Sequence, residues 1–263
     1  MHRVREYIQD LMSMSKKDKH PYMAVAQLVN WKPKYNWLAP LGFSLKWFLL
    51  NKTPSLAHRL YSLSINERIG DYAFVISNVG NAQPLKILDV GCYGGLLPIQ
   101  LAVLGNEVYG IDILNYPLDH SNFHFIKNDI MHLSFQDEFF DIVSCVSVLE
   151  HVGLGRYGDP TITDGDKLAL REMTRVLKPG GRIILTVPFG KGGICYHKGA
   201  PPHRLYTYER LTSILSGLTI EKAKFLVKHN HAWIETNWQE AERVDGLSKP
   251  EVLADALIVT RKT

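Results

Sequence analysis

Residues 87–95 read ILDVGCYGG, and this short stretch decides the fold that we expect for the chain. The apolar run that ends at Val90 is typical of a buried strand, and the glycines after it let the backbone turn sharply and approach a ligand closely. A leucine stripe at helical spacing over 97–104 follows, and Gly105 suits the position just after a helix. A strand, a glycine-rich turn and a helix in this order predict a βαβ unit whose helix start offers free N–H groups to an anion.

After Pro84, short apolar runs alternate with helical stretches, as in a parallel α/β sheet. Asp164 or Asp166 could cap the helix before the fifth strand. No convincing helix separates the last two strands, so we expect an antiparallel pair joined by an insertion over 228–254. The expected strands are Lys86–Val90, Glu107–Ile111, Phe123–Ile126, Phe140–Ser147, Arg182–Val187, Thr219–Val227 and Ala256–Arg261.

The composition is that of an ordinary globular protein. Of the 263 residues 46% are apolar and 21% charged, which excludes disorder, collagen and coiled coil as the main description. No apolar run approaches the roughly 20 residues that span a bilayer, and the N-terminus lacks the apolar core of a secretory signal. The three cysteines, Cys92, Cys145 and Cys195, are too few and scattered for a disulfide framework. We therefore expect a cytoplasmic protein.

Positive charge is concentrated near the N-terminus. Residues 1–60 carry ten Lys or Arg against three Asp or Glu, whereas the remaining chain carries 20 against 23. Such a segment can meet nucleic acid, anionic lipid or an anionic substrate, or it can be a solvated face. Residues 31–52 combine tryptophans with lysines and could contact a membrane surface or a second copy of the chain, or pack on the sheet domain. No recognised nucleic-acid motif accompanies them, so nucleic acid is not the partner that we expect.

Acidic residues follow the first three expected strands. Asp89 lies at the end of the first strand, Asp112 at the end of the second, and Asn128, Asp129 and Ile130 after the third. Each position taken singly also suits a turn or a helix cap. Together they fall at the carboxyl edge of adjacent parallel strands, where open α/β sheets bind ligands and where an acidic residue can accept both ribose hydroxyls of a nucleoside.

These runs resemble the class I S-adenosylmethionine-dependent methyltransferases, of the methyltransferase type 11 kind. The resemblance covers about residues 84–227, with a looser fit of the final strand. It implies a Rossmann-like three-layer α/β sandwich over 84–263, with a seven-stranded, mostly parallel sheet whose last strand is antiparallel. We expect a helical N-terminal extension over 1–83. The runs that carry the resemblance are ILDVGCYGG, VYGID at 108–112, FDIVSCVSVLEHV at 140–152, RVLKPGGRIILTVP at 175–188 and RLYTYERLTSIL at 204–215.

The resemblance also implies S-adenosyl-L-methionine as cofactor and S-adenosyl-L-homocysteine as product. Tyr93 departs from the family, which usually has glycine there. Its side chain could crowd the cofactor or cover it, and Gly94 could take up the strained backbone conformation. The implied contacts are Asp89, Gly91, Cys92, Tyr93 and Gly95 along the methionine part, Asp112 and Ile113 at the ribose, Asp129 and Ile130 at the adenine, and Ser147 and Val148 beside the methyl donor.

The acceptor pocket is expected in three loops at the same edge, over 150–165, 189–204 and 228–254. Methyl transfer needs alignment in a dry pocket, and it needs a base only where the acceptor must lose a proton. His151 is the first candidate for that base, ahead of His203, and Glu150 could share the role or hold the cofactor loop. Asp159, Asp164 and Asp166 could hold a divalent cation, but capping and turns explain these acids more simply, so we expect no metal.

The sequence thus predicts a methyltransferase that acts on a small-molecule or glycan-like acceptor, at oxygen. Three alternatives stay open. A nicotinamide-dependent oxidoreductase shares the glycine turn and the acid of the second strand, although Tyr93 breaks its G-x-G-x-x-G pattern. An RNA methyltransferase could recruit its substrate through the basic segment. A non-catalytic scaffold could keep the fold without the chemistry.

Overall fold

The computed structural model of the protein describes residues 29–33, 61–80, 84–155, 161–196, 202–230, 232–247 and 252–263. The chain divides into two compact units, Met1–Ile69 and Gly70–Thr263. In the first unit, β1 (Val29–Pro33) pairs antiparallel with β2 (Tyr61–Ile65).

The sequence predicted a helical extension over 1–83, and most of these residues lie outside the described ones. Those that are described hold the strands β1 and β2 as well as the helix α5 (Arg68–Val79), and α5 belongs mostly to the second unit. Residues 34–52, most of the segment considered for a membrane or homodimer contact, lie outside the described residues.

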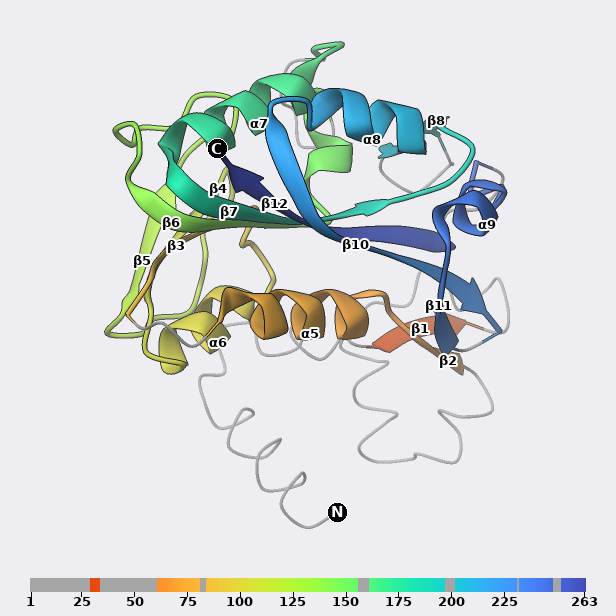
Figure 1. Ribbon diagram of the computed structural model, residues 1–263. Coiled ribbons are helices and arrows are strands. Elements are labelled where there is room, and N and C mark those ends of the chain that lie inside the picture. Colours follow the sequence, from red (N-terminus) through yellow and green to blue (C-terminus); the bar gives the residue numbers. More distant parts are fainter. Residues whose placement is uncertain are drawn as a thin grey trace, which may run out of the picture. The chain divides into compact units, whose positions relative to one another are not determined.

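The second unit is built on an eight-stranded sheet in the order β11-β10-β12-β7-β6-β3-β4-β5 (Figure 1). Its strands are β3 (Lys86–Val90), β4 (Glu107–Asp112), β5 (Phe123–Lys127), β6 (Phe140–Val146), β7 (Leu177–Pro188), β10 (Leu218–His229), β11 (Ala232–Thr236) and β12 (Ala254–Lys262). Its helices, besides α5, are α6 (Leu97–Val103), η2 (Leu149–His151), α7 (Gly165–Val176), α8 (Tyr208–Ile214) and α9 (Trp238–Glu242).

The strand directions confirm the Rossmann-like arrangement. The strands from β7 through β6, β3 and β4 to β5 run parallel, and β12 lies antiparallel between β7 and β10. The sequence predicted seven strands, and the eighth is β11. It folds back on β10 with Ala232 opposite His229, through a tight turn at Asn230 that has φ 56°. The insertion over 228–254 therefore carries a strand and a short helix.

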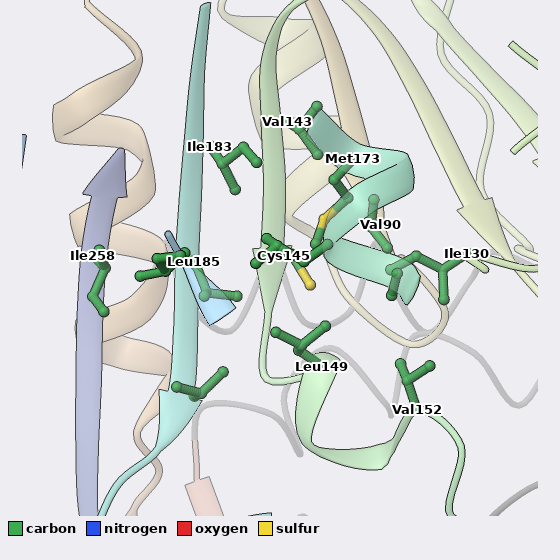
Figure 2. Packing of buried hydrophobic residues seen from close by; sticks show 14 of the residues in the cluster. Val90, Ile130, Val143, Cys145, Leu149, Val152, Met173, Ile183, Leu185 and Ile258 are labelled. Atoms are coloured by element: carbon green, nitrogen blue, oxygen red, sulfur yellow. The ribbon is translucent and has the colours of Figure 1, made fainter. Parts of the chain in front are cut away.

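Helices α5 and α6 cover one face of the sheet, and α7 and α8 cover the other (Figure 1). Strand residues alternate between these faces, so that Ile183 and Leu185 belong to the core under α7 and Ile184 to the core under α5. Figure 2 shows side chains of β6, β7, β12 and α7 meeting in the first of these cores.

The carboxyl ends of the parallel strands are the part of the sheet that carries the candidate site. At this edge η2 follows β6, and the short strands β8 (Gly193–Cys195) and β9 (His203–Leu205), which pair with each other, follow β7. No helix among the described residues is long and apolar enough to cross a membrane.

The core under α7 can be tested with a matched pair of isoleucines. Ile183 is fully buried, whereas Ile220 on β10 is 41% exposed. Ile183→Ala should lower the free energy of unfolding by about 2–5 kcal/mol because it leaves a cavity, and Ile220→Ala by less than about 1 kcal/mol. Urea titration followed by circular dichroism measures both. Equal losses in the two variants would contradict the assignment of Ile183 to the core.

Candidate active site

The glycine turn after β3 is held against the neighbouring strand β4. The backbone N–H groups of Gly91 and Cys92 both donate to the carbonyl of Ile111, at 2.8 and 3.2 Å. Gly91 and Gly94 adopt φ of 71° and 73°, while Tyr93 keeps a negative φ. A side chain at position 93 is therefore compatible with the turn, since Gly94 takes the left-handed conformation.

Gly91 also lies in close contact with the segment that follows β6. A Cβ atom at this position would lie 2.2 Å from Cγ2 of Val148, which follows the end of β6. Only glycine allows this approach. The turn that would hold the methionine part and the segment that would flank the methyl donor are thus in direct contact.

Asp112 connects the ends of β3 and β4. Its Oδ2 accepts the backbone N–H of Tyr93 at 2.9 Å, and its Oδ1 accepts that of Leu114 at 2.8 Å. Burial raises the pKa of Asp112, and the backbone hydrogen bonds oppose that rise. Each carboxylate oxygen can accept a second hydrogen bond, which suits a pair of vicinal hydroxyls. Ile113, the next residue, is half-buried at the same edge.

Asp89 and Tyr116 form hydrogen bonds beside the glycine turn. Asp89 is buried at the end of β3 and accepts a 2.7 Å hydrogen bond from Oγ of Ser144. Tyr116, which the sequence analysis missed, donates its hydroxyl to the carbonyl of Gly95 at 2.6 Å, and burial raises the pKa of that hydroxyl. Tyr116 lies beyond any glycine or acidic motif, so no pattern signalled it. Burial likewise raises the pKa of the Cys92 thiol, which keeps it protonated.

The candidates after β5 are only partly available to a ligand. Asp129 uses Oδ1 to accept the backbone N–H of Met131 at 2.9 Å, a local turn that keeps its carboxylate at the sheet edge. Ile130 is buried in the core under α7, so little of its side chain remains for contact with a ring.

The structure brings Glu150, His151 and His203 together. Nδ1 of His151 lies 2.9 Å from the carbonyl of Pro202, which can only accept, so this nitrogen carries a proton. Nε2 of His151 lies 3.4 Å from Oε1 of the buried Glu150. The ring of His203, on β9, is 6.3 Å from that of His151.

A buried ion-pair network supports this loop. Asp166 accepts hydrogen bonds from Nη2 of Arg210 at 2.7 Å and from the Tyr206 hydroxyl at 3.1 Å, and its carboxylate lies 3.6 Å from Nε of Arg204. Arg204 also donates to the carbonyls of Leu149 and Val152, the residues on either side of Glu150 and His151.

This network replaces the possible cation site that the sequence left open. The carboxylate of Asp166 is fully buried and faces two arginines. Asp164 occupies the N-cap position of α7 without a side-chain cap and pairs with Lys167 at 3.0 Å. Asp159 lies outside the described residues. Within the described ranges, no cluster of three His, Cys, Asp or Glu side chains is arranged to hold a metal.

The insertion over 228–254 packs beside the loop that follows β7. Trp238 stacks on Tyr208 with ring centroids 4.3 Å apart, and Glu242 accepts the N–H of Tyr208. The N–H of Lys191 donates to the carbonyl of Val244. Because β12 starts at the carboxyl edge, the insertion lies at the same end of the sheet as the candidate site, as the sequence predicted.

Residues 88–185 match the family model of a methyltransferase domain. Among curated proteins, the chain is 26% identical over 151 residues to a ubiquinone biosynthesis O-methyltransferase of Aliivibrio fischeri, which covers 54% of this chain and 57% of that protein. It is 28% identical over 150 residues to the protein of the same name from a Shewanella species, with 53% and 56% covered. The chain thus spans little more than half the length of these relatives.

Two solved structures share the fold. A SAM-dependent methyltransferase of Methanosarcina mazei superposes with a TM-score of 0.53 at 18% identity, over 72% of this chain and 96% of that one. A 1,6-didemethyltoxoflavin-N1-methyltransferase of Burkholderia thailandensis, solved with S-adenosylhomocysteine bound, gives 0.54 at 16% identity, over 89% and 95%. At these identities the likeness concerns the fold alone.

The match to the methyltransferase-domain model covers residues 88–185, which run from β3 into β7, and the fold is shared with these two solved methyltransferases.

A second glycine allows the effect of the close contact at Gly91 on stability to be distinguished from the effect of its positive φ. Gly180 has a similar φ, 76°, but nothing lies within 4 Å of a Cβ placed there. Gly180→Ala should cost about 1–2 kcal/mol of stability through the backbone alone. Gly91→Ala should cost more, because its Cβ would overlap Val148, and should also weaken S-adenosylmethionine binding.

Thermal unfolding and calorimetry measure the two effects of these substitutions. Replacing Val148 by Ala in the Gly91→Ala background should restore part of the lost stability. Equal behaviour of the Gly91 and Gly180 variants in both assays would refute the packing argument.

Proposed function

We propose that the protein transfers the methyl group of S-adenosyl-L-methionine to an oxygen of a small-molecule acceptor and releases S-adenosyl-L-homocysteine. The observation that carries the proposal is the position of Asp112. Its carboxylate ends β4 and bonds the N–H of Tyr93 within the glycine turn of β3. One side chain thereby joins the place for a ribose to the place for the methionine part.

The donor side rests on residues that the fold holds rigidly. Asp112 would accept the ribose hydroxyls, and Asp89, Gly91, Cys92, Tyr93 and Gly95 would line the methionine part. Asp129 would bond the adenine amino group, and Ser147 and Val148 would lie beside the methyl donor. All of these residues lie at or just beyond the carboxyl ends of β3, β4, β5 and β6, which are adjacent in the sheet.

Transfer to oxygen is favoured because a candidate base at the acceptor side could accept the proton of a hydroxyl group. The hydroxyl oxygen attacks the methyl carbon, the carbon–sulfur bond breaks, and the proton of the hydroxyl must leave. Since Nδ1 of His151 is held by the carbonyl of Pro202, Nε2 is the ring nitrogen that can take this proton. The carboxylate of Glu150, 3.4 Å away, would stabilise the imidazolium that results.

The names of the curated relatives agree with transfer to oxygen, while the Burkholderia enzyme is named for transfer to nitrogen. The common element is a small-molecule acceptor. An acceptor screen should therefore begin with small molecules that carry a hydroxyl group, phenols and sugars among them.

The donor assignment is tested by calorimetric titration of S-adenosylmethionine and S-adenosylhomocysteine. We expect micromolar binding of both by the wild-type protein and a loss of at least about tenfold in Asp112→Ala, since two hydrogen bonds to a charged group disappear. Because the pKa of Asp112 is raised from 3.8, binding should also weaken on acidification from a higher pH than for an ordinary aspartate. Asp141→Ala, at the opposite edge of the sheet, is the control.

The outcome of the titration also separates the alternatives. Unchanged affinity in Asp112→Ala would remove Asp112 from the ribose site. Binding of a nicotinamide dinucleotide in place of S-adenosylmethionine would favour an oxidoreductase. Binding of the cofactor without transfer to any acceptor would favour the scaffold.

The base assignment is tested by following S-adenosylhomocysteine formation with the acceptor that the screen identifies. His151→Ala should lower kcat by about 10²–10⁴-fold, as expected for loss of a general base, and leave cofactor affinity within about twofold. His124→Ala, an exposed histidine near the start of β5 and away from the carboxyl edge, should keep full activity. Full activity of His151→Ala would exclude it as the base and direct attention to Glu150 and His203.

A further inference from the structure

The glycine turn after β3 is held at both of its ends by the segment that follows β4. Near its start, the N–H of Tyr93 donates to the carboxylate of Asp112. At its end, the hydroxyl of Tyr116 donates to the carbonyl of Gly95 at 2.6 Å, a short O–H···O hydrogen bond. Asp112 is part of the proposed ribose site, whereas Tyr116 is not among the residues proposed to contact the cofactor.

The segment that carries Tyr116 is a loop. β4 and β5 are parallel neighbours, and residues 113–122, all of which the structure describes, join them without forming a helix. Parallel strands are usually joined by a crossover of a dozen or more residues that contains a helix. A loop lacks the backbone hydrogen bonds of a helix, so its position depends on individual contacts. The N–H of Leu114 on Asp112 is one of these, and the hydroxyl of Tyr116 on Gly95 is another.

The ring of Tyr116 packs against the core under α5. It meets the ring of Phe123 edge to face, with centroids 5.1 Å apart, and its centroid lies 6.2 Å from that of Phe125. Phe123 packs in turn on Gly110, where a Cβ atom would lie 2.7 Å from Cε2 of Phe123. Because this packing fixes the ring, the hydroxyl stays near the carbonyl of Gly95, and burial raises its pKa, which keeps it a donor.

The end of the glycine turn is not fixed by a helix cap. Helix α6 follows the turn, and its N-cap residue Leu96 makes no side-chain cap hydrogen bond. Within the turn, the N–H of Gly95 donates to the carbonyl of Cys92 at 3.0 Å. Gly94 has φ 73°, and a glycine passes easily between positive and negative φ. The hydroxyl of Tyr116 therefore ties this end of the turn to the loop after β4, where a cap does not.

We propose that Tyr116 is a positioning residue for the cofactor, whose hydroxyl holds the glycine turn in its binding conformation before the ligand arrives. The proposal rests on the proposed function, because it takes the turn to contact the methionine part of the cofactor. A ligand that binds one conformation of a turn has its apparent affinity reduced by the fraction of the protein that occupies that conformation. Tyr116 keeps this fraction high. Its loss should weaken S-adenosylmethionine and S-adenosylhomocysteine equally, because both carry the part that meets the turn.

The test replaces two tyrosines that each donate one short hydrogen bond. Tyr116→Phe keeps the ring and its packing and removes the bond to Gly95. Tyr109→Phe, the control, removes a 2.7 Å bond to Glu107 on a ring that packs against the other core, under α7. Hydrogen exchange of the unliganded full chain, followed by NMR, reports on the amides of Tyr93 and Gly95, which are both hydrogen-bonded in the turn. They should exchange faster in Tyr116→Phe and at the wild-type rate in Tyr109→Phe.

Calorimetry on the same three proteins measures the affinities for S-adenosylmethionine and S-adenosylhomocysteine. Leaving a carbonyl without its donor shifts the equilibrium between the two turn conformations by about 10- to 100-fold. That factor is divided between faster exchange and weaker binding. We therefore expect each to change by about three- to tenfold in Tyr116→Phe, with the same loss of affinity for both ligands, and no change in Tyr109→Phe.

Wild-type exchange at the turn in Tyr116→Phe overturns the proposal, and so does faster exchange with unchanged affinities. An equal loss of affinity in Tyr109→Phe would indicate an effect of general stability and would also overturn it. A wild-type protein that binds neither ligand would overturn the proposed function itself. The exchange comparison, which uses no ligand, would then still decide whether Tyr116 holds the turn, so the two failures are distinguishable.

Discussion

The close approach of Gly91 to Val148 is the constraint on which the site depends. At that point the turn after β3 and the segment after β6 touch with no space for a Cβ atom. The strands themselves are held by backbone hydrogen bonds, with Val90 opposite Cys145 in the last pair of the register. Any larger residue at position 91 would push the two segments apart, and with them the two groups of residues that would meet across the methyl carbon.

The two sides of the site are built in different ways. The proposed donor side consists of backbone turns and carboxylates at the ends of parallel strands, whose positions follow from the sheet. The proposed acceptor side consists of loops that are joined by side-chain hydrogen bonds and ion pairs. Arg204 reaches from β9 to the carbonyls on either side of Glu150 and His151, and Asp166 on α7 holds Arg204 in place. Removing one partner of a buried ion pair destabilises a protein strongly, because the other charge is left buried without a partner. The pair therefore fixes the loop geometry, and substitutions of either partner should be poorly tolerated.

The sequence predicted the strands of the sheet well because the signals for them are local. The apolar runs, the glycines and the strand-end acids each depend on a few neighbouring residues, and the expected strands agree with β3 to β7, β10 and β12 to within a few residues at their ends. The strand β11 was missed because the turn at Asn230 lacks the usual glycine, and the run after it was taken for part of a loop. Asp166 was interpreted as a cap or a cation ligand, since its arginine partners lie about 40 residues further along the chain.

Asp71 is fully buried in the first turn of α5 and accepts a 3.4 Å hydrogen bond from Ser147. The sequence analysis did not predict this contact. A single acid on the apolar face of a helix indicates a buried hydrogen bond, because a buried carboxyl group needs a partner. The identity of that partner depends on how α5 crosses the sheet, and no periodicity in the sequence encodes this crossing. The same limit explains why the cofactor follows from the motifs and the acceptor does not. The proposed cofactor would contact turns at the strand ends, whose positions follow from local sequence, whereas an acceptor would contact side chains on loops that only the folded chain brings together.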